Sequence, residues 1–393
     1  MQNISLLLGA GFSVNRGYPT AAMLNEKLTK LTKADFCVST GGSLCWLSEG
    51  QKDPFTYSSY YTSKMFTLAC IEFYSKANSF NYEEFYDFYK SMEQNHNDSK
   101  SFNTFCDEFR QLYHCKTDNL NLLNGLGNIY NQLIAAFLVD SEGKKFYDPG
   151  HLGYPTCPGY TGFLNCLQSW GEDHIVHIHT LNHDLFFEIF KSSDWLKGEL
   201  DDGFKELGSS YYGDFQERFK VRLPYFANFY EKRFRLYKLH GSIDQYPFHL
   251  KNFGIDGYIK IKLGIGTDGL YKEVENEKGE LQYVNDWINY HSDFLSGTTS
   301  KILRYREPWY YEKVFNHLEK NLIASKNLVI IGYGCGDTEI NNLIEKYYDK
   351  SKHVFIVEPF PHQRTYTFCE NFNAKLIVKN IDNLSTEDFI IEQ

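Results

Sequence analysis

The first segment with residues suited to chemistry lies near the start of the chain, at residues 9–13, which read Gly-Ala-Gly-Phe-Ser. It follows an apolar run at residues 4–8 and precedes a stretch with helical spacing. Glycines let backbone N–H groups approach a pyrophosphate, and the N-terminus of the next helix adds a favourable dipole. A tight structural turn accounts for the same residues equally well. If the segment binds phosphate, a Cβ branch at Gly11 is expected to intrude on it.

Two more polar segments follow apolar runs in the second half of the chain. Residues 180–184 read Thr-Leu-Asn-His-Asp and come after a run at 175–179, and His240 comes after a run at 236–239. Asn182 and Asp184 stand two positions apart at a strand end, so their side chains point the same general way. Helix capping is the competing role for Asp184, and a lone histidine is usually structural. In a parallel sheet, all three segments converge on one crevice.

The elements that must position these segments alternate between strand and helix. Helical spacing is present at residues 20–32, at 309–325 and from about 338, and a helix is expected to start at 185–187. The predicted strands lie at residues 4–8, 175–179, 236–239, 328–331, 354–357 and 376–378. This alternation predicts an α/β fold with a Rossmann-like, doubly wound, mostly parallel sheet.

Two other parts of the chain depart from this alternation. Residues 36–63 have a loop-like composition, and helical periodicity follows from 65 to 140. We therefore predict that residues 36–150 form a helical module inserted into a core made of 1–35 and 151–393. Later in the chain, residues 211–235 have an aromatic, helical appearance, and residues 255–285 suggest a hairpin extension with turns at Gly269 and Gly279.

Composition excludes several classes of protein. The net charge of −10 over 393 residues argues against a dedicated nucleic-acid-binding chain. The nine cysteines form no C-x-x-C pair, which argues against a zinc ribbon and for reduced thiols. The chain opens without a signal peptide and has no run of about 18 apolar residues, so a cytoplasmic protein with no membrane segment is expected.

In their order along the chain, these segments resemble the motifs of the sirtuin family, and more closely those of its bacterial sirtuin-like branch. In sirtuins a G-A-G-x-S loop cradles NAD, a Q-N-x-D segment lines the nicotinamide and ribose site, and an H-G stretch supplies the catalytic histidine. The resemblance places these on residues 9–13, on Asn182 and Asp184 (with Leu181 where sirtuins have Gln), and on His240-Gly241.

The resemblance extends to residues 1–30 and 160–380. Gly17-Tyr18-Pro19 is similar to the family's G-I-P, residues 332–337 resemble a late G-Y-S-x-x-D segment, and Glu358 falls where the family contacts the adenosine ribose. It implies that Asn182 and His240 are catalytic. The implied NAD-binding residues are Gly9, Ala10, Gly11, Phe12, Ser13, Pro19, Thr180, Asp184, Gly332, Tyr333, Gly334, Asp337 and Glu358.

Three departures bear on the activity that the resemblance implies. Thr20-Ala21-Ala22 replaces the D-F-R of deacylating sirtuins, and the two C-x-x-C pairs of their zinc ribbon are absent. Asn182 and His240 are 240 − 182 = 58 residues apart, which requires an insertion between them. The branch with these features hydrolyses NAD to nicotinamide and ADP-ribose without a metal. An NAD-dependent protein deacylase and a non-enzymatic sensor of NAD or ADP-ribose are the alternatives.

The resemblance also implies a biological setting. Members of this branch act in anti-phage defence, where depletion of NAD stops the infected cell, and some pair with a separately encoded HerA-type hexameric ATPase. This sequence contains no Walker motif, so it does not supply that ATPase itself. Because an unrestrained NAD hydrolase would kill its host, we expect a homo-oligomer or partner to control it through the 36–150 module.

Overall fold

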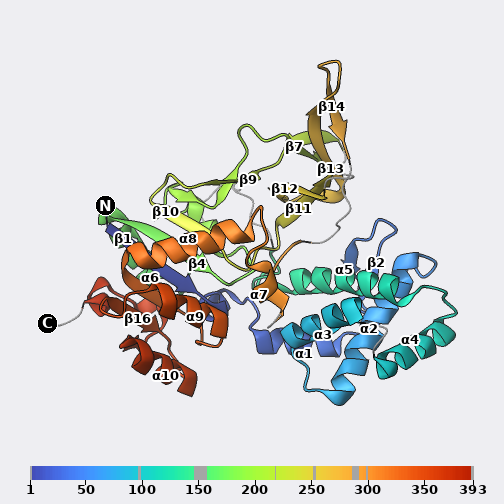
Figure 1. The fold of residues 1–393 in the computed structure, drawn as a ribbon, viewed down its shortest axis with the longest axis horizontal. Coiled ribbons are helices and arrows are strands. Elements are labelled where there is room, and N and C mark those ends of the chain that lie inside the picture. The colour runs from blue at the N-terminus through green and yellow to red at the C-terminus, as the bar shows by residue number, and fades with distance from the viewer. Residues whose placement is uncertain are drawn as a thin grey trace.

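A seven-stranded parallel sheet forms the core of the molecule (Figure 1). The computed structural model describes residues 2–95, 99–145, 157–216, 218–250, 254–285, 292–297 and 300–390. The strands lie in the spatial order β17 (Lys375–Ile377), β16 (His353–Val357), β15 (Ser325–Ile331), β1 (Gln2–Leu8), β4 (His174–Thr180), β10 (Phe234–Lys238) and β5 (Leu200–Asp201). All neighbouring pairs are parallel, which confirms the predicted α/β, Rossmann-like sheet.

Helices cover both faces of this sheet. Leu6 and Leu8 point to the face covered by α6 (Thr161–Asp173), with η4 (Ile381–Asn383) and η5 (Thr386–Phe389) nearby. Leu7 and Leu328 point to the other face, against α8 (Tyr311–Ala324), α9 (Thr338–Tyr347) and α10 (Gln363–Phe372). Burial on both faces explains why the strands are continuous apolar runs in the sequence.

A helical module lies to one side of the sheet (Figure 1). It contains α1 (Ala21–Lys30), β2 (Phe36–Val38), β3 (Leu44–Trp46), α2 (Ser59–Ala77), α3 (Tyr82–Asn95), α4 (Lys100–Tyr113) and α5 (Asn119–Phe137). The helical prediction for residues 65–140 is confirmed. The loop prediction for 36–63 is wrong in part, because Phe36 and Val38 are buried in a short hairpin under the helices. Within the described residues, no helix is long and apolar enough to cross a membrane.

The boundaries proposed for the module remain predictions, and the packing of α1 bears on them. Leu24 and Leu28 of α1 are buried among the side chains of α2, α3 and α5, in the cluster that forms the core of the module. The first helix after β1 therefore belongs to the module by its packing, although it precedes residue 36 in the sequence.

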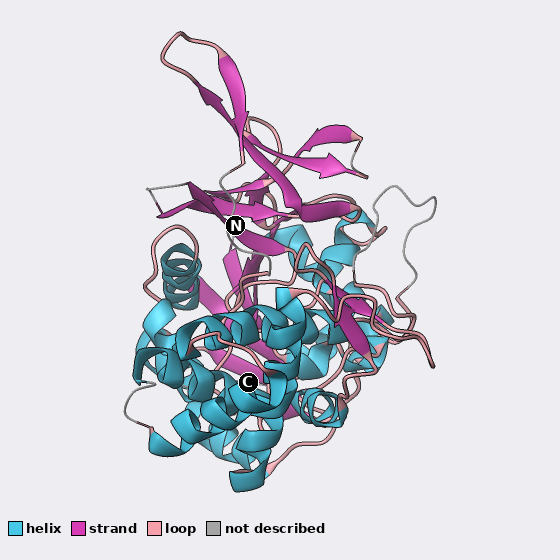
Figure 2. Ribbon diagram, turned by 90° about the vertical axis from the view of Figure 1, so that its right-hand side faces the viewer, coloured by secondary structure: helices cyan, strands magenta, loops and turns pink. Residues whose placement is uncertain are grey.

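Two antiparallel sheets project from the core beyond β10 (Figures 1 and 2). One has the order β11 (Gln245–Leu250), β12 (Gly254–Lys260), β9 (Tyr225–Phe229), β6 (Gly203–Lys205), and the other β14 (Leu281–Val284), β13 (Ile265–Glu275), β7 (Tyr211–Phe215), β8 (Phe219–Arg222).

These sheets correct one prediction and confirm most of another. The helical prediction for 211–235 is wrong, because these residues form short strands, where frequent aromatic residues pack well on a pleated surface. The hairpin extension is confirmed with a turn at Gly279, whose φ is 79°. Gly269 forms no turn, since it lies inside β13 where the register with β7 shifts.

The switch point of the sheet lies between β1 and β15. From β1 the chain proceeds to β4 and β10 on one side and then returns to β15 on the other. Here the two glycine turns pack backbone to backbone: Gly11 N–H donates to Gly332 O at 2.8 Å, and a Cβ at Gly332 would lie 2.3 Å from Phe12 N. In open α/β sheets ligands bind at such a switch point, beyond the carboxyl ends of the strands.

This packing predicts unequal costs for two glycine substitutions. Gly332 and Gly334 both have positive φ values, 61° and 64°, but a Cβ at Gly334 would meet nothing within 4 Å. We expect Gly334→Ala to lower the free energy of unfolding by about 1–2 kcal/mol, from backbone conformation alone. Gly332→Ala should cost about 1–3 kcal/mol more, because the strands must separate. Urea unfolding of both variants measures the difference, and equal costs would contradict the packing.

Candidate functional site

The polar segments singled out in the sequence all lie at the carboxyl edge of the sheet. Leu181 N–H donates to Leu8 O at 3.0 Å, and Leu239 N–H donates to Thr180 O at 2.9 Å, so the chain leaves β1, β4 and β10 at one level. Residues 332–337 follow β15 and Glu358 follows β16 at the same edge. The structure therefore brings the predicted site residues together, while their roles stay predictions.

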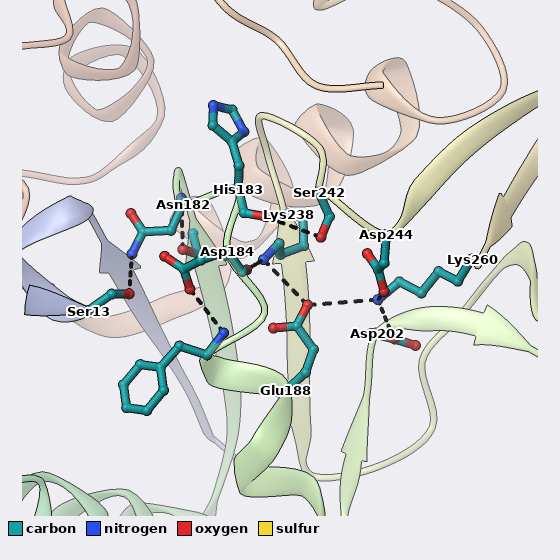
Figure 3. A network of polar contacts seen from close by, with 12 residues as sticks. Ser13, Asn182, His183, Asp184, Glu188, Asp202, Lys238, Ser242, Asp244 and Lys260 are labelled. Carbon is teal, nitrogen blue, oxygen red and sulfur yellow. Dashed lines mark hydrogen bonds and ion pairs between the residues drawn. The ribbon is translucent and has the colours of Figure 1, made fainter. Parts of the chain in front are cut away.

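Asn182 is fixed by two hydrogen bonds from its amide nitrogen (Figure 3). Nδ2 donates to Gly9 O and to Ser13 Oγ, both at 3.0 Å, and the Asn182 backbone N–H donates to Thr180 Oγ1 at 3.1 Å. Both amide hydrogens are thereby used, and Oδ1 points the other way (Figure 3). The side chain is buried, so its one remaining function is that of a preorganised acceptor.

Asp184 binds a backbone N–H group just before the next helix, but it is not the N-cap of that helix, a position that Phe186 occupies. Asp184 Oδ1 accepts a hydrogen bond from Phe186 N–H at 3.0 Å, at the start of the short 3₁₀ helix η3 (Phe187–Ser192) that stands where an α-helix was expected. Burial raises the pKa of Asp184, while Lys238 and the Ser13 hydroxyl lower it. Ser13 thus bonds to Asn182 and stabilises the charged form of Asp184.

A buried ion network continues from Asp184 towards the antiparallel strands (Figure 3). Lys238 Nζ donates to Asp184 O and lies 3.3 Å from Glu188 Oε1. Lys260 Nζ lies 3.8 Å from the same Glu188 oxygen and 2.8 Å from Asp202 Oδ2. Burial raises the pKa of Glu188. The network fixes η3 to β10 and β12, and so supports the loop that carries Asn182.

His240 follows β10 and is buried with one ring nitrogen unengaged. Nε2 makes no hydrogen bond to any described residue, and Asp337 Oδ2 lies 3.9 Å away, beyond hydrogen-bonding distance. Burial is the main reason that the pKa of His240 lies well below its usual range, with smaller effects from Lys301 and His183. The imidazole is therefore neutral at pH 7 and able to accept a proton.

Three residues near His240 were not identified from the sequence. The ring of His183 lies 6.1 Å from that of His240, and burial lowers the pKa of His183 to about 3. Tyr305 stacks on His240 at 6.4 Å. Lys301, on the short helix α7 (Ser300–Arg304), lies 2.7 Å from Asp337 Oδ2. His183 lies inside a segment that the sequence did single out, but no sequence signal marks Lys301 or Tyr305.

The glycine turn at residues 9–13 offers fewer free donors than a phosphate cradle would suggest. The N–H groups of Gly9, Gly11, Phe12 and Ser13 already donate to backbone carbonyls. The Phe12 side chain is buried in an aromatic cluster with Tyr160 and others, so it faces the core. A Cβ at Gly11 would lie 2.8 Å from Gly332 Cα. We expected a Cβ branch at Gly11 to intrude on a bound phosphate, and this reason is corrected. A larger residue at Gly11 first disrupts the contact with the turn at Gly332.

The other residues assigned by resemblance lie around this edge with structural partners. Tyr333 donates its hydroxyl hydrogen to Asp337 O at 2.8 Å, and Asp337 Oδ1 caps α9 by accepting from Glu339 and Ile340 N–H. Pro19 is buried, in the loop after η1 (Ala10–Phe12) and η2 (Val14–Arg16). Glu358 is partly exposed at the end of β16, and burial raises its pKa.

A separate cavity of about 400 Å³ lies within the helical module, lined by residues that include Leu28, Met65 and Tyr113. None of its lining residues belongs to the carboxyl edge. The described residues contain no group of three or more histidines, cysteines or acidic residues arranged to hold a metal.

Comparisons with known proteins identify a family for the chain. The family model for the SIR2-like domain matches residues 176–377, a range that includes Asn182, His240, Asp337 and Glu358 but not residues 9–13. A solved structure described as "Structural Basis for the Mechanism and Regulation of Sir2 Enzymes" aligns with 97% of this chain and 88% of its own, at 11% identity and a TM-score of 0.32. A search of curated proteins finds no significant match.

The buried histidines predict that acidification destabilises the fold. His177, His179 and His240 are all buried, and burial lowers their pKa values, to about 3 for His177. The unfolded chain therefore binds more protons below pH 6.5, and stability falls as pH falls through that value. Each histidine should cost about 1.4 kcal/mol between pH 7.5 and 5.5. Urea unfolding at both pH values tests this, and His240→Asn should lose about 1.4 kcal/mol less than wild type.

Proposed function

Because the chain belongs to the SIR2-like domain family, whose members use NAD, we propose that it hydrolyses NAD at the nicotinamide–ribose bond. The products are nicotinamide and ADP-ribose. The observation that carries the proposal is a pair of buried side chains at the carboxyl edge of the sheet: Asn182 with a fixed amide, and His240 with a neutral imidazole whose Nε2 makes no hydrogen bond to any described residue.

Cleavage of the nicotinamide–ribose bond determines which functions the residues at the carboxyl edge of the sheet must supply. As nicotinamide departs with the bonding electron pair, the ribose gains oxocarbenium character, and a water oxygen then bonds to its anomeric carbon. The protein has to hold the ribose, place the water and accept one proton. It has no need to protonate the leaving group, because nicotinamide leaves as a neutral molecule.

Asn182 suits the positioning of water or of a ribose hydroxyl. Its amide hydrogens are committed to Gly9 O and Ser13 Oγ, so only Oδ1 remains to accept a hydrogen bond. An acceptor that cannot rotate is preorganised, and no reorganisation is required when the transition state forms. A carbonyl oxygen near the ribose also favours the positive charge that develops there.

His240 suits the role of general base. It is neutral at pH 7, and a neutral imidazole accepts a proton from water or from a ribose hydroxyl as the new bond forms. Burial alone makes the imidazolium costly, so proton transfer requires a nearby negative charge. Asp337 Oδ2, 3.9 Å from Nε2, is the carboxylate in position to supply it.

The rest of NAD is assigned to the neighbouring strand ends by family resemblance. Glu358 follows β16, beside the turn at residues 332–334, and suits the hydroxyls of the adenosine ribose. Ala10 and Gly11 are exposed on the other side of the switch point, where the resemblance places the pyrophosphate, although the Gly11 N–H is committed to Gly332 O. A role in anti-phage defence, self-association and pairing with a HerA-type ATPase remain expectations from sequence resemblance. Light scattering and phage challenge of expressing cells test them separately.

We predict that Asn182→Ala and His240→Ala each lower NAD hydrolysis by about 10²–10⁴-fold, through loss of water placement or of the base. Nicotinamide release from purified protein and NAD is the measurement. His174→Ala is the matched control, because His174 lies at the amino end of β4, at the opposite edge of the sheet from His240. Wild-type rates in both site variants would contradict the assignment.

The same assay separates the alternatives. Nicotinamide release that requires an acyl-lysine peptide and yields O-acyl-ADP-ribose would identify a deacylase. Binding of NAD by calorimetry with no nicotinamide release, alone or with a HerA-type ATPase, would identify a sensor.

A further inference from the structure

A three-part ion contact joins the helical module to the candidate base. Lys301 Nζ lies 2.7 Å from Asp337 Oδ2 on the core side and 3.7 Å from Glu83 Oε1 on the module side. The same Asp337 oxygen lies 3.9 Å from His240 Nε2. Lys301 is 6% exposed, so water does little to screen these charges. The contact links α3, α7, the N-terminus of α9 and the end of β10.

We propose that Lys301 is a positioning residue that withholds the Asp337 carboxylate from His240, and that Glu83 on α3 is its alternative partner. With Lys301 on Asp337, no described acidic residue lies at hydrogen-bonding distance from His240. When Lys301 moves to Glu83, Asp337 becomes available to His240. Only the expected effect on turnover rests on the proposed function; the effect of Lys301 on His240 does not.

The distances support this order of partners. At 2.7 Å, the Lys301–Asp337 contact is a charge-assisted hydrogen bond, whereas the 3.7 Å to Glu83 and the 3.9 Å to His240 are too long for one. Asp337 Oδ1 is engaged with the N-terminus of α9, so Oδ2 is the oxygen for which Lys301 and His240 compete. At these distances Oδ2 is hydrogen-bonded to Lys301 and not to His240.

Electrostatics point the same way. Lys301 lowers the pKa of His240, as a buried cation near the ring does. Burial raises the pKa of Glu83, which Lys301 lowers. Among the described residues, the titratable and charged groups that face His240 are His183, Tyr305, Lys301 and Asp337, and Glu83 and Asp87 lie beyond Lys301 on α3. Of these groups, Lys301 is the cation that contacts both Asp337 of the core and Glu83 of the helical module.

The segment around α7 lies over His240, which gives the contact of Lys301 with Asp337 and Glu83 a role in turnover. Leu295 N–H donates to His240 O at 2.7 Å, and Arg304 Nη2 binds both carboxylate oxygens of Asp293 at 2.9–3.0 Å, which ties the segment around α7 to the end of β10. A Cβ at Gly297 would lie 2.3 Å from Asp87 Oδ1, so α3 packs directly on this segment. A shift of α3 therefore moves Lys301 relative to Asp337.

The test is the pKa of His240, measured by NMR in protein labelled with ¹⁵N-histidine and assigned with His240→Gln. In wild type we expect His240 to stay neutral down to pH 5. Lys301→Met removes the cation and releases Asp337, so the pKa of His240 should rise by about one to three pH units. Lys301→Arg should resemble wild type. Lys313→Met, on the exposed side of α8, is the matched control and should also leave the value unchanged.

Glu83→Gln should leave His240 neutral, because Lys301 then has only Asp337 as partner, and Glu84→Gln is its control on the same helix. Should Lys301→Met fail to fold, the double variant Lys301→Met with Asp337→Asn leaves neither charge unpaired. The repulsion from Lys301 is still removed, so the pKa of His240 should rise, by less than in the single variant. A value unchanged from wild type in the folded variant would overturn the proposal.

Kinetics provide the second arm. In Lys301→Met the acid limb of the kcat/KM profile for NAD should move to higher pH together with the NMR value, whereas a merely structural role would lower activity equally at every pH. If wild type releases no nicotinamide, the proposed function fails, but the NMR titration still decides whether Lys301 controls His240. A shifted NMR pKa with an unmoved kinetic profile would show that His240 is not the base.

Discussion

The contact between the two glycine turns is the constraint on which the candidate site depends. Gly11 N–H donates to Gly332 O, and neither residue has room for a Cβ, so the ends of β1 and β15 meet through backbone atoms alone. This contact fixes the Gly9 carbonyl, and Gly9 O in turn accepts from Asn182. The candidate catalytic amide is therefore held by the sheet itself, and backbone atoms are the least mobile groups available for that purpose.

Much of the fold could be predicted because burial on two faces leaves a strong pattern. The apolar runs at 4–8 and 328–331 became β1 and β15, and parallel strands necessarily bring the residues after them to one edge. The helical prediction for residues 211–235 was wrong because frequent aromatic residues occur in helices and in strands. Only pairing with distant strands decides between the two.

The site could be predicted only as far as it lies at strand ends. Phe12 and Ser13 are neighbours in one motif, yet Phe12 packs into the aromatic core and Ser13 bonds to Asn182. The motif does not reveal which of its side chains faces a ligand. Lys301 and Glu83 are 301 − 83 = 218 residues apart and meet only through the docking of α3 on α7. No local pattern marks such a contact.

The buried lysines at this edge raise a question of charge. NAD cleavage develops positive charge on the ribose, and an unpaired cation in a buried site would oppose it. Lys238 lies beside Glu188, and Lys301 lies beside Asp337. Each carboxylate therefore offsets a cation that the fold has buried next to the candidate catalytic residues. The pairing reduces the electrostatic repulsion on a positively charged transition state. It also makes the electrostatic field at His240 depend on which carboxylate each lysine contacts. Charge balance at this edge is thus a condition for folding and would be one for the proposed catalysis, and the helical module bears on it through Glu83.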